Sequence, residues 1–141
     1  MTHARGELIS RDDIPTSLRD VLLGFPWDLD RLFDLDLPVE EVRTADFLWL
    51  LDLPFWRKGD VVFAVTPNQV RGNPFGYAEQ WTRTLETDLT RPIHVTERKG
   101  RTVIIDGIHR LLKADIEGRR TLPARRVPRE MFSRIRAPAA T

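Results

Sequence analysis

The sequence predicts an α+β domain, and three observations carry that prediction. Apolar residues make up 41% of the 141 residues, a share that suffices for the packed core of one domain. Short segments rich in β-branched residues, at 61–65, 93–96 and 102–105, are typical of strands. Segments with apolar residues at helical spacing lie between them, bounded by proline and glycine.

The first third of the chain is predicted to be largely helical. Residues 10–24 are predicted to form a helix, and residues 25–38 a short helix with one buried face. A brief strand is expected over 39–42. Thr44 is expected to cap a further helix over 45–51.

The middle of the chain contains a clear helix start. Thr66 and Pro67 follow the strand at 61–65 as a cap and a first-turn proline, and they predict a short helix. A longer helix is predicted over 75–89. Its apolar residues recur every four positions and are expected to form its buried face: Tyr77, Trp81, Leu85 and Leu89.

The last third is predicted to hold most of the sheet. Strands at 93–96 and 102–105 are joined by a turn. A bend at Gly107 then leads into a helix over 109–117, which is followed by a strand at 123–127. A basic helix is expected from there to about residue 135.

Composition excludes several classes of function. The chain has no cysteine, so disulfides, thiolate catalysis and zinc–thiolate sites are excluded. Its three histidines show no paired ligand spacing, and any metal is therefore expected to be Mg²⁺ that arrives with a nucleotide. There is no apolar run of membrane-spanning length and no signal-peptide pattern, so no membrane partner and a cytoplasmic location are expected.

Charge is distributed unevenly along the chain. Residues 1–97 carry 10 Lys and Arg against 17 Asp and Glu, whereas residues 98–141 carry 12 against 4. This asymmetry suggests an anionic partner for the last third, or simply charges that intermix on one surface. A basic set in this part could follow nucleic acid or form a solvated face: Arg119, Arg120, Arg125, Arg126, Arg129, Arg134 and Arg136.

The strand–turn–helix around Asp106 is the strongest candidate site. Free N–H groups and the positive end of a helix dipole converge where Gly107 begins the helix. His109 and Arg110 place cationic groups in the same turn, which is unfavourable unless an anion binds there. In the alternative interpretation, Asp106 caps the helix, Arg110 pairs with a surface acid and His109 belongs to a structural hydrogen-bond network.

This junction, D-G-x-H-R, and the strands on either side of it resemble the ParB/sulfiredoxin superfamily. The resemblance covers about residues 39–128, with residues 1–38 as an N-terminal helical extension and residues 129–141 as a basic helix and tail. It implies a mixed sheet with helices packed against it, and a turn and helix start that bind nucleotide phosphates. The motif version is similar to that of the free-serine-kinase-like members.

The resemblance implies roles for named residues. Gly107, Ile108, His109 and Arg110, together with Lys113, would bind the phosphates of ATP or another nucleotide. Asp106 would face the reacting end and contact Mg²⁺, and His109 is included among the catalytic candidates. Sulfiredoxin-like members have a cysteine at the position of Ile108, so repair of sulfinic acid is excluded.

An ATP-dependent kinase of a small hydroxylated acceptor needs a second carboxylate. Asp52, flanked by large apolar residues, is the candidate, and a helix-end or Arg57-paired role is its alternative. Trp56 is expected to lie in the core or to stack on a base. Two other functions stay open, a nucleotide-sensing or interaction module without catalysis and a DNA-binding or nuclease-like protein.

Overall fold

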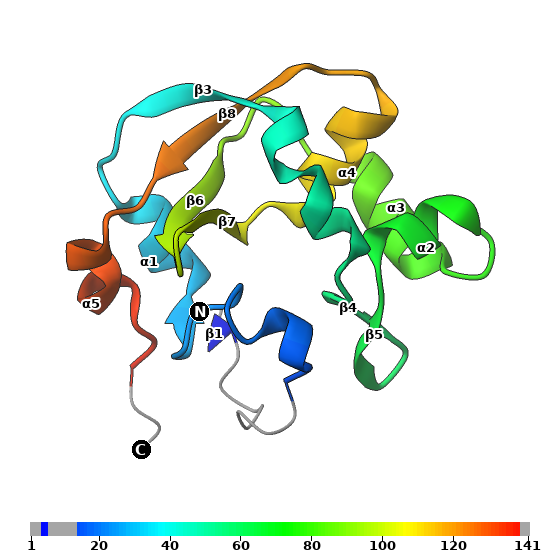
Figure 1. Ribbon diagram of the computed structural model, residues 1–141, viewed down its shortest axis with the longest axis horizontal. Helices are drawn as coiled ribbons and strands as arrows, with labels where there is room; N and C mark the ends of the chain where they lie inside the picture. The colour runs from blue at the N-terminus through cyan, green and yellow to red at the C-terminus, as the bar shows by residue number, and fades with distance from the viewer. Residues whose placement is uncertain (1–3, 6–13, 139–141) are drawn as a thin grey trace.

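The computed structural model describes residues 4–5 and 14–138, and it has an α+β architecture, as predicted. A four-stranded sheet with the order β3-β8-β6-β7 forms its centre (Figure 1). The central pair β6 and β8 is parallel, whereas β3–β8 and β6–β7 are antiparallel. The sheet is therefore mixed, and its strands are β3 (Val39–Arg43), β6 (Ile93–Arg98), β7 (Arg101–Asp106) and β8 (Thr121–Arg126).

The segment from β6 to β8 follows the predicted order. Lys99 and Gly100 have φ of +52° and +79°, values that suit the two-residue turn of the β6–β7 hairpin. After β7, α4 (Ile108–Ile116) crosses the sheet so that β8 returns parallel to β6. Gly118, with φ of +71°, follows the end of this helix.

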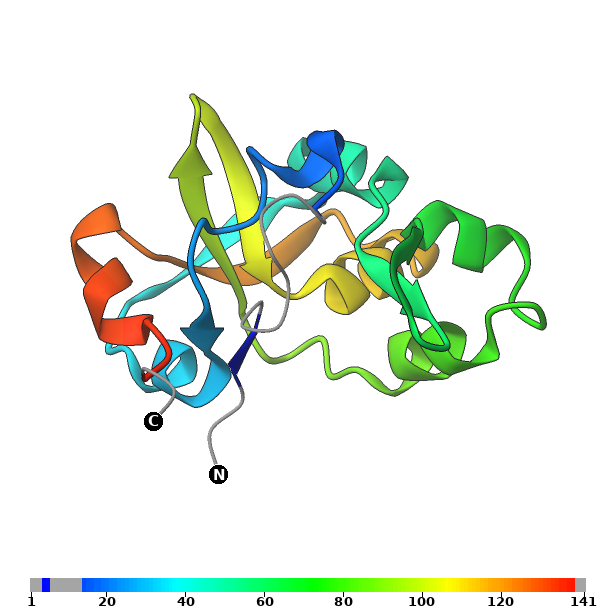
Figure 2. The same cartoon turned by 90° about the horizontal axis from the view of Figure 1, so that it is seen from below.

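One face of the sheet packs against α4 and the helical segments near it. These are η3 (Thr44–Asp52), α2 (Pro67–Gly72) and α3 (Ala78–Glu86), next to the hairpin of β4 (Trp56–Lys58) and β5 (Val61–Val65). The main core lies here, and its largest fully buried side chains include Leu50, Leu51, Ile93, Val95, Leu111, Leu112 and Leu122. Figure 2 shows α2, α3 and the β4–β5 hairpin together at one end of the molecule.

The opposite end holds the first and last segments of the chain (Figures 1 and 2). Here α1 (Leu29–Asp34) packs against α5 (Phe132–Ile135), which follows η4 (Arg129–Met131). A second apolar cluster fills the space between them: Leu23, Leu32, Leu35, Val127 and Ile135. Short pairing of β1 (Ala4–Arg5) with β2 (Trp27–Asp28) lies beside it, and Trp27 also forms a β-bridge with Arg136, so β2 pairs with segments near both ends of the chain.

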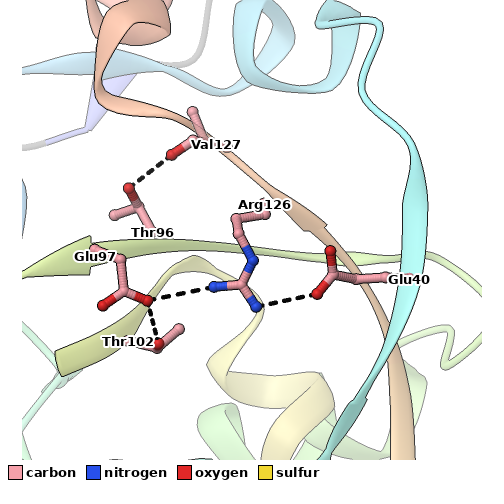
Figure 3. Close-up of polar contacts among 6 residues, drawn as sticks. All are labelled: Glu40, Thr96, Glu97, Thr102, Arg126 and Val127. Atoms are coloured by element: carbon pink, nitrogen blue, oxygen red, sulfur yellow. Dashed lines mark hydrogen bonds and ion pairs between the residues drawn. The ribbon is translucent and has the colours of Figure 1, made fainter.

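An ion-pair network crosses all four strands of the sheet (Figure 3). Arg126 on β8 pairs with Glu40 on β3 at 3.0 Å and with Glu97 on β6 at 3.3 Å. Thr102 on β7 donates to the same Glu97 carboxylate. Beside it, the buried Thr96 hydroxyl donates to the carbonyl oxygen of Val127 at 2.7 Å. This use of Arg126 inside the sheet favours a structural role for part of the basic set.

The predicted helix over 10–24 is wrong in its described part, because only η2 (Thr16–Leu18) forms there. Residues 10–13 lie outside the described residues. Leu18 and Val21 pack in the main core, whereas Leu23 packs in the second cluster. A single short helix could not direct its apolar residues into two separate clusters, so the chain turns between them.

Other helices also differ from the prediction. α3 is shorter than 75–89, and its buried side chains are Gln80 and Thr84, whereas Leu85 is half exposed. η3 is a 3-10 helix whose N-cap is Arg43, and no side chain of the described residues caps it. The basic helix expected to about residue 135 is reduced to η4 and the four-residue α5, and β1, β2 and β4 were not predicted. The other predicted strands and helices form close to their expected bounds, and Thr66 caps α2 in a full capping box with Gln69.

Candidate functional site

The strand–turn–helix junction forms where the sequence predicts it. β7 ends at Asp106, Gly107 makes the bend with φ of +124°, and α4 begins at Ile108. Residues with a side chain rarely adopt such a φ. A Cβ atom at Gly107 would also lie 2.5 Å from Cγ2 of the buried Ile93. Backbone conformation and packing therefore require this glycine independently of any ligand.

The start of α4 is not capped by any side chain of the described residues. Gly107 occupies the N-cap position, and it has no side-chain oxygen that could accept a capping bond. Asp106 instead accepts a hydrogen bond from Nη1 of Arg110 at 3.3 Å, so its interpretation as the helix cap is wrong. The positive end of the helix dipole thus lacks the capping oxygen that would compete with an anionic ligand.

His109 is held between α3 and β4. Its imidazole stacks on the indole of Trp56, with ring centroids 4.2 Å apart and planes inclined by 11°. Its Nε2 lies 2.9 Å from Oε1 of Gln80, whose Nε2 donates to the carbonyl oxygen of Arg57 at 3.1 Å. Because a carbonyl oxygen only accepts, this last bond orients the Gln80 amide and makes Nε2–H of His109 the donor. Nδ1 is then the basic nitrogen of the neutral ring.

A cleft of about 780 Å³ opens beside the junction. Its walls come from the segment 14–27, the β4–β5 hairpin, α3, the β6–β7 turn and residues 104–109. Its volume lies within the range of roughly 300–1,000 Å³ that is typical of small-molecule sites. Five cationic side chains line it against two carboxylates: Arg19, Arg57, Arg83, Arg98 and Lys99 against Asp20 and Asp106. The cleft is therefore suited to an anionic ligand.

The cationic side chains of the cleft differ in the ion pairs and hydrogen bonds that they form. Arg57 pairs with Glu79 at 3.5 Å, with both side chains more than half exposed, so this pair is weak. Arg98 donates to the carbonyl oxygen of Arg19 at 3.3 Å. Arg83 forms no ion pair within the described part of the chain. Its charge, like that of Lys99, is engaged by no carboxylate of the described residues and is available to a ligand.

The structure places some predicted site residues in the cleft and others outside it. Asp106, Gly107, Ile108 and His109 line the cleft, whereas Arg110, Lys113 and Asp52 do not. Arg110 is buried and donates to Asp106 and to the carbonyl oxygen of Pro92. Nζ of Lys113 donates to the carbonyl oxygens of Leu85 and Thr87, which fastens the end of α3 to α4.

Asp52 lies at the exposed end of η3. Nδ2 of Asn68 donates to its Oδ1 at 2.7 Å. Asp52 therefore does not line the cleft that Asp106 lines. Asp20 is the second carboxylate that lines the cleft, although nothing in the sequence singled it out.

Sequence reasoning also missed Gln80, Arg57 and Arg83. The apolar spacing in α3 pointed to Trp81, which is one position away from the buried Gln80. A glutamine on a buried helix face needs a hydrogen-bond partner, and this need was the available signal. The participation of 14–27 in the cleft could not be found from sequence, because it depends on a contact between distant parts of the chain.

The described ranges contain neither a cluster of metal-binding side chains nor a membrane-spanning helix. Within residues 4–5 and 14–138, no three His, Asp or Glu side chains gather as a metal-binding group. No helix in the same residues has the length and apolar character to cross a bilayer. Comparisons of the chain with family models, curated proteins and solved structures give no match.

Proposed function

We propose that this chain binds a nucleotide, with the phosphates at the start of α4 and the rest of the ligand in the adjoining cleft. One observation carries the proposal. The uncapped, positive end of α4 opens into a cleft in which five cationic side chains face two carboxylates. A multiply charged phosphate chain is the common ligand that uses both a helix dipole and several cations.

The phosphate end of the cleft is defined by three groups. Gly107 begins the helix there, His109 is positioned by Gln80, and Arg83 provides a cation that no carboxylate of the described residues neutralises. The aromatic residues for a base lie elsewhere in the cleft, because His109 already covers one face of Trp56. The partly buried aromatic side chains that line it are Phe25, Trp27, Phe55 and Phe63.

The fold supports the same proposal. A mixed sheet with a strand–Asp–Gly–helix–strand unit is compatible with the ParB/sulfiredoxin-like arrangement to which the D-G-x-H-R motif is similar. We assign this arrangement as part of the proposal. Most arginines of the basic set make internal contacts, including Arg125 with the Phe33 carbonyl and Arg126 with two carboxylates. Those contacts favour a nucleotide over nucleic acid as the partner.

Phosphoryl transfer to a small hydroxylated acceptor is a second candidate function. It is favoured by Asp20 and Asp106, two carboxylates that line the same cleft. One could orient an acceptor hydroxyl, and the other could contact Mg²⁺ that arrives with the nucleotide. A single carboxylate fits such a phosphate-bound metal, although it would not hold a metal by itself. Asp52 is not used in this version, because it lies outside the cleft.

Binding is tested by titrating the purified chain with ATP, CTP, GTP and ADP in the presence of Mg²⁺. We expect one nucleotide to raise the melting temperature, since a ligand at 100 times its Kd adds about 2.7 kcal/mol of stability. Arg83→Gln should lower the affinity for that nucleotide at least tenfold. Arg129→Gln, the same charge change at an exposed position outside the cleft, should not.

The outcomes separate the candidate functions. Formation of a phosphorylated acceptor that is lost in the Asp20→Asn and Asp106→Asn variants would identify a kinase. Stabilisation of the chain by a nucleotide without turnover would identify a sensing module. Equal nucleotide affinity of the Arg83→Gln and Arg129→Gln variants would show that the nucleotide does not bind in this cleft. Absence of a shift with all four nucleotides would leave the junction as a structural element.

A further inference from the structure

A second cationic cluster lies on the α1 side of the sheet, outside the cleft. Its centre is the aromatic ring of Phe33 on α1. Cζ of Arg91 lies 4.4 Å from the ring centroid, and Cζ of Arg110 lies 5.9 Å from it. Nη1 of Arg125 donates to the carbonyl oxygen of the same residue at 3.2 Å. Three guanidinium groups thus meet at one residue, two at its ring and one at its backbone carbonyl.

The buried His94 forms the floor of this cluster. It is fully buried on β6, and its ring packs edge-on against Phe33 with centroids 4.7 Å apart. Strand register places it opposite Arg125 on β8 and Asp106 on β7, so these side chains lie on the same face of the sheet. Burial, followed by the charges of Arg125, Arg110 and Arg91, lowers the pKa of His94 to about 4.

Unsatisfied polar atoms are concentrated at the same place. In the described part of the chain, eight buried side-chain nitrogen or oxygen atoms have no hydrogen-bond partner. Four of the eight are here: both ring nitrogens of His94 and Nε of Arg110 and Arg125. Leaving a buried polar group unpaired costs about 1–3 kcal/mol, so such a concentration requires an explanation.

The cluster is also open on one side. Nη2 of Arg110 and Nη2 of Arg125 bond to no protein atom of the described residues, and neither belongs to the buried unpartnered set. Arg91 is exposed. Two carboxylates face these cations. Asp106 is bonded to Arg110, and the exposed Asp88 accepts hydrogen bonds from Thr90. Positive charge is therefore in excess at an accessible point.

We propose that Arg91, Arg110 and Arg125, gathered around Phe33 above His94, form a binding site for a small oxyanion such as phosphate or sulfate. Guanidinium groups bind such anions through paired N–H donors. The bound anion would pair with Nη2 of Arg110 and Nη2 of Arg125, which bond to no protein atom of the described residues. This site differs from the proposed nucleotide cleft, since none of its arginines, His94 or Phe33 lines that cleft.

The experiment is a titration of the full chain with sodium sulfate against sodium chloride at equal ionic strength. We expect saturable stabilisation by sulfate alone. The ¹⁵N-labelled ring of His94, assigned with His94→Gln, should change its resonance during the titration. Arg91→Gln should lower the affinity for sulfate at least tenfold, because it removes one guanidinium of the cluster, which lies over the Phe33 ring. Arg129→Gln is the matched control and should leave sulfate affinity unchanged.

Several results would overturn the site. These are equal stabilisation by chloride, unchanged affinity in Arg91→Gln, or a resonance change at His109 without one at His94. The last result would place the anion in the cleft instead. Inorganic phosphate and glycerol phosphate then separate two sources of the ligand. Binding of inorganic phosphate alone would indicate a free anion, and equal binding of both would indicate the phosphate group of a larger molecule.

Discussion

The imidazole of His109 and the indole of Trp56 lie almost parallel, with centroids 4.2 Å apart. The pair joins the first turn of α4 to β4, and Trp56 is only 6% exposed. One face of this tryptophan is therefore occupied by a residue of the junction rather than by a ligand. Together with the bond to Gln80, the stacking fixes the position of the His109 ring at the wall of the cleft.

Replacing Gln80 tests how this ring is held. Gln80→Ala would remove both the acceptor of His109 Nε2–H and the donor to the Arg57 carbonyl. We expect a loss of about 1–3 kcal/mol in the free energy of unfolding, measured by urea denaturation. Thr82→Ala, at an exposed position of the same helix, should change it by less than about 0.5 kcal/mol. Equal effects of the two changes would show that the Gln80 bonds contribute nothing.

Replacing Gly107 tests the origin of the bend. Gly107→Ala would hold alanine at a φ of +124° with its Cβ against Ile93, so we expect a cost of about 2–5 kcal/mol. Gly72→Ala is the control, since a Cβ there meets no atom within 4 Å and its φ is not positive. That change should be neutral or stabilise by up to about 1 kcal/mol. Thermal denaturation distinguishes the two, and a well-tolerated Gly107→Ala would contradict the packing described here.

His94 predicts a dependence of stability on pH. The pKa of this ring is about 4 in the folded chain, against 6.5 for an unperturbed histidine, so the unfolded chain binds the extra proton between these values. Stability attributable to His94 is therefore present above pH 6.5 and is lost as pH falls toward 4, by up to about 3 kcal/mol.

The measurement compares denaturation of the wild-type chain with His94→Leu, from pH 7 to pH 4, in chloride buffers. Carboxylates titrate in both proteins, so the difference between their curves isolates His94. Parallel curves would show that the folded and unfolded chains bind a proton at His94 with equal affinity.

The polar contacts of Figure 3 predict an order of effects. Thr96→Val removes a buried hydrogen bond to the Val127 carbonyl and should cost about 1–2 kcal/mol. Arg126→Gln removes two ion pairs, but their side chains are 43–59% exposed, so the cost should stay below about 1 kcal/mol. Added salt should reduce only the Arg126 effect. The reverse order in urea denaturation would contradict this ranking.

Local signals in the sequence predict the part of the fold that contains the junction. The β6–β7 turn, the bend at Gly107 and the capping box at Thr66 each depend on residues within a few positions of one another. The junction residues Asp106 and His109 were found for the same reason. The 3-10 turn at Thr16–Leu18 was not predicted, because the partition of Leu18 and Leu23 between two cores is a tertiary effect.

The rest of the candidate site depends on contacts across the chain. Arg110 was expected to point at the ligand, yet its partners are the Asp106 carboxylate and the Pro92 carbonyl, behind the cleft wall. Asp52 has the apolar neighbours that made it the candidate second carboxylate, but the end of η3 leaves it exposed. Residue type and spacing identified the junction, whereas the side on which each residue lies was set by the packing of α1, α3 and β4 around it.

The ion pair between Asp106 and Arg110 has a thermodynamic consequence. Asp106 lines the cleft proposed to bind a nucleotide, and Arg110 belongs to the cationic cluster around Phe33. An oxyanion bound by Arg110 would compete with Asp106 for the guanidinium and leave more negative charge facing the cleft. The two ligands would then oppose each other, and linkage requires that each lower the affinity of the other by the same factor. One ion pair between the end of β7 and the first turn of α4 would thus make the two proposed sites negatively cooperative.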